Sequence, residues 1–114
     1  MAEKTSLANS KINVQRCPRV EKAISILGKR WTGLIIWALL EGSLRFNELL
    51  KICNPVSDRV LTERLRELEM EGLVERSVFT DTIIRVEYTL TPKGRSMHKV
   101  IEALEEWAGA WVDV

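Results

Sequence analysis

The fold of this chain is decided by residues 57–72, which read SDRVLTERLRELEMEG. Three leucines in this stretch, Leu61, Leu65 and Leu68, recur at the spacing that places side chains on one face of a helix. Ser57 is a residue type that caps helices, because its hydroxyl accepts a hydrogen bond from an otherwise unpaired backbone N–H. Gly72 is a typical helix terminator. The stretch therefore predicts an amphipathic helix with a buried leucine face and a polar face.

The hydrophobic period changes directly after this helix. From Leu73 onward, apolar and polar residues alternate over residues 74–80 and again over residues 84–90, which is the period of a β-strand. Asp81-Thr82 lies between the two runs and supplies turn residues. We therefore expect a two-stranded hairpin.

A shorter helix precedes the leucine-faced one. It is marked by Phe46, Leu49 and Leu50, and the pair Asn54-Pro55 ends it. Two short helices joined by a turn, with a hairpin immediately after the second, form a winged helix-turn-helix. In that arrangement the second helix enters the major groove of DNA and the hairpin lies along the DNA backbone.

Further amphipathic helices flank this unit. One is predicted over residues 18–28, with a proline at its first position, and another from near residue 31 to the glycine at residue 42. After the hairpin, Thr91-Pro92 starts a last helix whose apolar stripe extends to Trp111. We expect an α+β, mostly helical fold: a winged helix-turn-helix with an added C-terminal dimerisation helix.

Length and composition agree with one globular domain. The 114 residues are 46% hydrophobic and 29% charged, which excludes a disordered chain and a disulfide-stapled miniprotein. We expect a flexible N-terminal segment over residues 1–14 and one folded domain over residues 15–114. The longest apolar run, residues 34–40, is far below the ~20 residues of a membrane span, and the first ten residues lack a secretory signal. These features predict a cytoplasmic protein that does not enter membranes.

The polar face of the 57–72 helix carries side chains that read base edges. Arginine pairs with guanine, threonine contacts the thymine methyl group, and glutamate accepts from cytosine. Further arginines before the short helix and on the hairpin are candidates for phosphate contacts. An ordinary solvated helix face is the alternative, and a net charge of +1 does not decide between the two. The candidate DNA-binding residues are Arg45, Ser57, Asp58, Arg59, Thr62, Glu63, Arg66, Arg76 and Arg85.

The order of several short motifs resembles a known family. In chain order the motifs are Cys17-Pro18, GKRWT at 28–32, LRFNEL at 44–49, SDRVLTERLREL at 57–68, GLVER at 72–76 and RVEYTLTPKGR at 85–95. Their sequence and spacing, over residues 17 to about 112, resemble the HxlR-type family of bacterial winged-helix transcription regulators. The resemblance implies a cytoplasmic homodimer on a pseudo-palindromic double-stranded DNA operator, with residues 57–68 in the major groove and residues 74–90 as the wing.

The last helix also suggests self-association. Its apolar stripe is longer than one small core requires, and large exposed apolar patches mark interfaces. A two-fold dimer would pair this helix with its copy and with the first helix, and would space two recognition helices ~34 Å apart. The alternative is that both indoles pack against the helix-turn-helix of the same chain. The candidate interface residues are Val20, Ile24, Ile101, Leu104, Trp107 and Trp111.

Two cysteines are candidates for redox sensing. Cys17 precedes the first-turn proline of the first helix, where the helix N-terminus and the flanking Arg16 and Arg19 favour a thiolate. The family resemblance implies that a cysteine at this position senses oxidants or electrophiles; the alternative is that it packs as a small apolar residue. Cys53, in the loop before the recognition helix, is the second candidate, and we hypothesise an intersubunit disulfide between Cys17 and Cys53.

No catalytic site, metal or cofactor is expected. His98 is the sole histidine and has no identifiable acid to orient it for thiol catalysis. Two cysteines without a Cys-x-x-Cys pair, together with one histidine, fall short of a zinc site. Because a fold does not dictate its function, the serious alternative to DNA binding is a winged helix that makes protein–protein contacts only.

Overall fold

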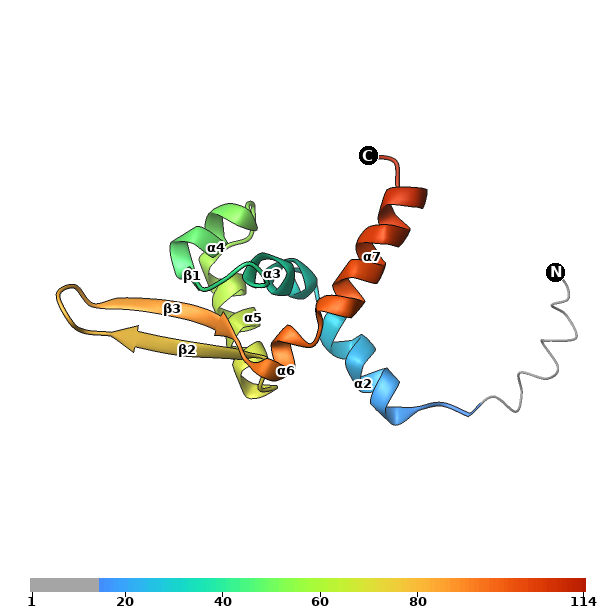
Figure 1. The fold of residues 1–114 in the computed structure, drawn as a ribbon, viewed down its shortest axis with the longest axis horizontal. Helices are drawn as coiled ribbons and strands as arrows, with labels where there is room; N and C mark the ends of the chain where they lie inside the picture. Colours follow the sequence, from blue (N-terminus) through green and yellow to red (C-terminus); the bar gives the residue numbers. More distant parts are fainter. Residues whose placement is uncertain (1–14) are drawn as a thin grey trace, which may run out of the picture.

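The structure is a computed structural model and describes residues 15–114, so the expected flexible segment 1–14 lies outside the described residues. The described chain consists of helices and one small sheet, as Figure 1 shows. The α+β winged helix-turn-helix expected from the sequence is confirmed. The elements are α2 (Pro18–Leu27), α3 (Thr32–Leu39), β1 (Leu44–Arg45), α4 (Phe46–Ile52), α5 (Asp58–Met70), β2 (Val74–Phe79), β3 (Arg85–Leu90), α6 (Pro92–Arg95) and α7 (His98–Trp111).

Helix α5 forms where the leucine spacing predicts it. Its N-cap is Ser57, whose hydroxyl accepts a hydrogen bond of 3.1 Å from the backbone N–H of Val60. The three leucines of its apolar face are buried. The chain leaves the helix through Gly72, whose φ of 77° is a left-handed conformation that glycine adopts without steric cost.

The sheet has three antiparallel strands in the order β1-β3-β2. In the wing hairpin Val74 pairs with Leu90 and Val78 with Val86, so the alternating residues share one face, as expected. The third strand was not expected from the sequence. It has only two residues, Leu44 and Arg45, and it exists because they pair with Tyr88 and Glu87 of β3, far along the chain.

The core lies between the helix-turn-helix and the base of the wing. Helix α3 contributes three fully buried side chains, and α5 contributes its leucines. The hairpin contributes Val74, Tyr88 and Leu90, with Val86 packed beside them, whereas residues 78–84 around the tip are exposed. The central members of the core are Ile35, Ile36, Leu39, Leu49, Leu61, Leu65 and Leu68.

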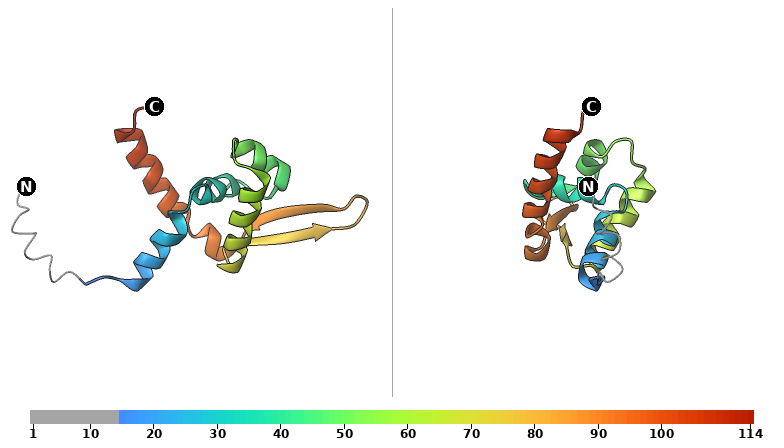
Figure 2. Two further views of the ribbon diagram at one scale, coloured as in Figure 1. Left: turned by 180° about the vertical axis from the view of Figure 1, so that it is seen from behind. Right: turned by 90° about the vertical axis from the view of Figure 1, so that its right-hand side faces the viewer.

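Helices α2 and α7 project from this body on the side opposite the wing, in both Figure 1 and the left view of Figure 2. None of the residues of α2 is buried, and Ile101 is the one buried residue of α7. The Cα radius of gyration is 17.9 Å, whereas a compact domain of about this size measures roughly 13 Å. No helix in residues 15–114 combines the length and the apolar character needed to cross a membrane.

The segment after the wing forms two helices, not the single helix expected. The chain turns at Ser96 and Met97, between α6 and α7. The N–H of Met97 bonds to the carbonyl of Gly94, three residues back, and the Ser96 hydroxyl donates to the carbonyl of Lys93. Such local bonds compete with the regular helical pattern, so the apolar stripe is re-aimed where α7 begins.

Candidate nucleic-acid interface

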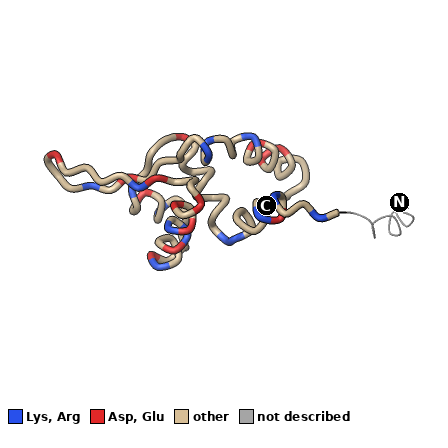
Figure 3. The backbone as a smooth tube through the Cα atoms, turned by 90° about the horizontal axis from the view of Figure 1, so that it is seen from below, with Lys and Arg blue, Asp and Glu red and all other residues tan. Residues whose placement is uncertain are grey.

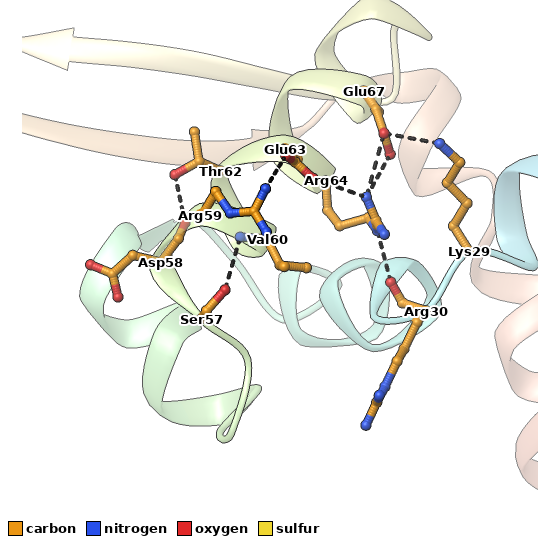
Figure 4. A network of polar contacts seen from close by, with 10 residues as sticks. All are labelled: Lys29, Arg30, Ser57, Asp58, Arg59, Val60, Thr62, Glu63, Arg64 and Glu67. Atoms are coloured by element: carbon orange, nitrogen blue, oxygen red, sulfur yellow. Dashed lines mark hydrogen bonds and ion pairs between the residues drawn. The ribbon is translucent and has the colours of Figure 1, made fainter.

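The N-terminal part of α5 presents its polar side chains to solvent. Ser57, Asp58 and Arg59 are exposed, and the Arg59 side chain keeps 82% of its accessible surface (Figure 4). Arg59 lies 3.5 Å from Glu63, one helical turn further on. Thr62 is half-buried, and its hydroxyl donates to the carbonyl of Asp58 at 2.8 Å. The start of this helix is therefore accessible to a partner, as the sequence predicted.

Arg66 faces a groove between α5 and the wing. The groove has a volume of about 400 Å³ and is lined by Thr62, Leu65, Arg66, Glu69, Arg76 and Tyr88. Arg76 comes from β2 and pairs in register with Tyr88 of β3. Among residues 15–114, neither Arg66 nor Arg76 forms an ion pair, so both cations are free to bind an anion.

Arg85 is already engaged within the wing. Its guanidinium lies 3.3 Å from Asp81 and 3.2 Å from Glu87, and it stacks 4.4 Å from the ring centre of Phe79. Two carboxylates and an aromatic face thus already surround this cation, and a phosphate contact of Arg85 stays a prediction. The sequence shows that an arginine is on the wing, but not that acidic neighbours surround it.

Arg45 lies in β1, the edge strand opposite β2, and is the N-cap of α4. It is exposed, and its backbone N–H donates to Glu48 at 2.8 Å, which fixes the first turn of the helix. Acidic and basic residues are interspersed along the described chain in Figure 3, without a continuous basic strip. Any phosphate contacts therefore depend on individual arginines.

Arg64 is a residue of α5 whose role the sequence did not reveal. Its side chain is 18% exposed, and its Nε donates to the backbone carbonyl of Arg30 at 2.9 Å. It also lies 3.4 Å from Glu67, which accepts a hydrogen bond of 2.9 Å from Lys29 (Figure 4). Helical spacing places Arg64 beside the leucine face, but its partner is a distant carbonyl group that no sequence pattern identifies.

The projecting helices expose most of the expected dimer residues. Val20 and Ile24 on α2 are exposed, as are Leu104, Trp107 and Trp111 on α7. Trp107 is 59% exposed, so the alternative in which both indoles pack against the same chain is wrong. Ile101 requires a correction: it is only 5% exposed and belongs to the core cluster, because the first turns of α7 lie against the body.

The two cysteines differ completely in environment. Cys17 is exposed at the N-cap of α2, so it does not pack as a core residue. The neighbouring Arg16 forms two hydrogen bonds, of 2.6 and 2.7 Å, to the carboxylate of Glu21. Cys53 ends α4 with no exposed surface, and burial raises the pKa of its thiol. Burial makes Cys53 the less reactive of the two thiols, and its pairing with Cys17 of a partner stays a prediction.

The family model described as HxlR-like helix-turn-helix matches residues 26–114, which include every element from the end of α2 onward. This chain belongs to the HxlR-like helix-turn-helix family. The transcriptional regulator YvaP of Bacillus subtilis is 48% identical over 99 residues, covering 87% of this chain and 92% of that protein. The chain is thus a transcriptional regulator by family, and the expectation that it is not an enzyme is confirmed by relatives that are regulators.

Solved structures of family members have the same fold. The reduced form of YodB from Bacillus subtilis matches with a TM-score of 0.79 and 42% identity, covering 87% of this chain and 97% of that chain. The oxidised form of the redox regulator HypR matches with a TM-score of 0.79 and 38% identity, covering 86% and 100%. A quinone-bound structure of YodB matches with a TM-score of 0.75 and 43% identity, covering 84% and 100%. These relatives are redox-sensing or quinone-binding regulators.

Proposed function

We propose that this regulator binds a pseudo-palindromic site on double-stranded DNA as a homodimer. Each α5 enters a major groove and each β2–β3 wing lies along the backbone. The observation that carries the proposal is the accessible start of α5, whose cap and first turn project free while the leucines behind them anchor the helix in the core. Because relatives such as YvaP are bacterial regulators, we assign this protein to the cytoplasm, where bacterial DNA lies.

The side chains of this surface divide into two groups by their chemistry. Arg59, Thr62, Glu63 and Arg66 lie on or beside the exposed face of α5, where they reach base edges. Arg45 and Arg76 are exposed cations on flanking elements and suit phosphate contacts. Ser57 and Asp58 form the end of α5 that would lie nearest the major groove of the DNA. We assign Arg85 to the shape of the wing and not to the phosphates, because its charge is already balanced.

A second copy of the chain supplies the missing partner for α2 and α7. Both helices carry exposed apolar side chains on a part of the molecule remote from the wing. Exposed apolar patches of this kind are buried in stable oligomers, and a two-fold interface would hold two α5 helices at a fixed separation.

We further propose that Cys17 switches DNA binding in response to an electrophile. Its exposed thiol lies at the start of α2, within the proposed dimer-forming region. The Cys17 thiolate would add to a carbon of a quinone C=C bond, forming a sulfur–carbon bond as the π bond breaks; the electron pair moves to the quinone oxygen, which takes a proton from water. The quinone-bound and redox-regulated relatives support this signal class. We assign this reaction to Cys17 and not to Cys53, because the Cys53 thiol is enclosed in the core.

The test of DNA binding is selection of duplex oligonucleotides by the purified full chain, followed by anisotropy titrations at several salt concentrations. We expect a symmetric site and a logarithmic salt slope of about −0.9 for each phosphate neutralised. Arg66→Ala should weaken binding roughly tenfold or more, whereas Arg95→Ala, an exposed arginine on α6, should leave it unchanged. Binding without a salt slope, indifferent to Arg66→Ala, would favour the protein-interaction alternative.

The thiol switch has a separate test. Wild type and the Cys17→Ser variant are treated with benzoquinone, analysed by intact mass, and titrated with the selected duplex. We expect one adduct and a changed affinity for wild type, and neither for Cys17→Ser. A Cys53→Ser variant that behaves like wild type would agree with the burial of that thiol; an adduct retained in Cys17→Ser would refute the assignment.

A further inference from the structure

We propose that Arg64 is a positioning residue that sets the angle between α5 and α2, and thereby the spacing at which two half-sites are read. This inference rests on the proposed function, in which two α5 helices bind one DNA site. Arg64 does not itself face the DNA. Its guanidinium is mostly buried and is directed to the connection between α2 and α3, residues 28–31 (Figure 4).

The contacts of Arg64 join α5 to the connection between α2 and α3. Its Nε donates to the Arg30 carbonyl at 2.9 Å, and its Nη1 lies 3.4 Å from a carboxylate oxygen of Glu67. The same Glu67 oxygen accepts from Lys29 Nζ at 2.9 Å. The planar guanidinium holds Nε and Nη1 at fixed relative positions, whereas the three donors of a lysine ammonium share one nitrogen on a flexible stem. Arginine therefore suits this joint better than lysine.

The connection that Arg64 holds has a defined backbone shape. Trp31 adopts a left-handed conformation with a φ of 81°, which is costly for a bulky residue and persists only where its surroundings impose it. The guanidinium carbon of Arg30 lies 4.7 Å from the centre of the Trp31 ring. The Arg64 bond to the carbonyl of Arg30 is thus made directly beside the residue that turns the chain from α2 into α3.

Apolar packing holds only the C-terminal end of α2, where Ile26 and Leu27 are half-buried against the core. No residue of α2 is buried, and a cavity of about 220 Å³, lined in part by Ile26 and Leu68, separates the two helices. An ion pair of 3.1 Å between Lys22 and Glu71 spans this space, but both side chains are substantially exposed. Exposed pairs contribute little on their own. The less exposed Arg64 joint is therefore the principal polar constraint on the angle between these helices.

A change in this angle would alter what the dimer recognises. In the proposed dimer α2 belongs to the shared interface, whereas α5 reads each half-site. Half-sites about one helical turn apart, ~34 Å, are matched only when both α5 helices keep a fixed orientation to that interface. Loss of the Arg64 contacts should therefore reduce the ability of the dimer to distinguish DNA sites whose half-sites are spaced differently. The contacts of one α5 with one half-site should stay intact.

The experiment compares the full chain with Arg64→Met and Arg64→Lys on three duplexes. These are the selected site, the same site with one base pair inserted between its half-sites, and a single half-site. Wild type should bind the lengthened site about tenfold more weakly than the selected site. Both variants should reduce this ratio severalfold while their single-half-site affinity stays within about twofold of wild type.

Two controls separate this proposal from neighbouring ones. Arg95→Met removes an exposed arginine elsewhere and should keep the wild-type ratio, and Glu67→Gln, which keeps the Arg30 bond available, should reduce the ratio less than Arg64→Met. Far-UV circular dichroism checks that each variant is folded, and Arg64→Lys retains the charge if Arg64→Met does not fold. An unchanged ratio, or an equal loss on all three duplexes, would overturn the role of Arg64. Wild type without spacing discrimination would overturn the proposed dimeric function as well.

Discussion

Gly94 of α6 packs directly on the backbone carbonyl of Leu73, which lies just before β2. A Cβ atom at this glycine would overlap the carbonyl oxygen, and Gly94 is buried. The same Leu73 carbonyl accepts a hydrogen bond of 3.0 Å from the N–H of Thr91. This close backbone contact docks α6 beside the base of the wing and determines where α7 departs.

Gly94→Ala should therefore strongly destabilise the protein. Main chain cannot move aside as a flexible side chain does, so we expect a loss of about 2–4 kcal/mol in the free energy of unfolding, measured by urea denaturation. Gly109→Ala is the matched control, because a Cβ there meets nothing within 4 Å. That change should be neutral or stabilising by up to about 1 kcal/mol, since alanine favours helix. Equal effects of the two changes would contradict the docking role of Gly94.

The cap of α5 gives a second prediction. Ser57→Ala leaves the N–H of Val60 without its side-chain acceptor, and should cost about 1 kcal/mol in the free energy of unfolding. Ser25→Ala is the comparison, because that exposed serine bonds only to a carbonyl of its own helix and should change stability by less than about 0.5 kcal/mol. Thermal or urea unfolding of both variants measures these differences in the free energy of unfolding. A Ser57→Ala protein as stable as wild type would exclude a contribution from the cap.

The buried thiol of Cys53 predicts a pH dependence of stability. Burial raises the pKa of this thiol in the folded state, so the unfolded chain loses the proton at a lower pH. The corresponding stability is fully present below the unfolded pKa of about 8.5 and is lost as pH rises through the folded pKa. Urea unfolding under reducing conditions should show a steeper decline above about pH 8.5 for wild type than for Cys53→Ala. If the free energy of unfolding falls equally with pH in both proteins, Cys53 does not contribute to the pH dependence of stability.

The proposed interface on α7 gives a fourth prediction. Leu104→Glu places a charge on the exposed apolar stripe and should convert a dimer into a monomer in light-scattering chromatography, because an unpaired charge is costly to bury. Ile83→Glu is the matched control at an exposed apolar residue on the wing and should remain dimeric. A wild-type monomer, or a Leu104→Glu dimer, would rule out this face.

The elements were largely predictable from local patterns. The bounds of α2 and the capping of α5 follow from a first-turn proline, a serine N-cap and terminal glycines, whose effects act within a few residues. The hairpin follows from the change of period at Leu73. The division of the last helix was missed: local bonds of Ser96 and Met97 mark the break, and hydrophobic periodicity does not reveal them.

The candidate site was predictable only in part. The exposed residues of α5 follow from helical spacing, since the leucines fix which face is buried. The ion pairs of Arg85 and the burial of Ile101 and Cys53 do not follow from the sequence, because they depend on which residues the folded chain places around each side chain. One arginine is neutralised, one isoleucine enters the core, and one thiol is enclosed.

The sequence by itself determined the helices, the wing and the polar face of α5, because periodicity, capping and turn chemistry are properties of neighbouring residues. Only the tertiary structure decided that β1 completes the sheet, that most of α2 and of α7 projects from the body, and that Arg64 binds the carbonyl of Arg30. Those features arise where segments distant in the chain meet. Their geometry is set by the packing of the whole core, not by any local pattern.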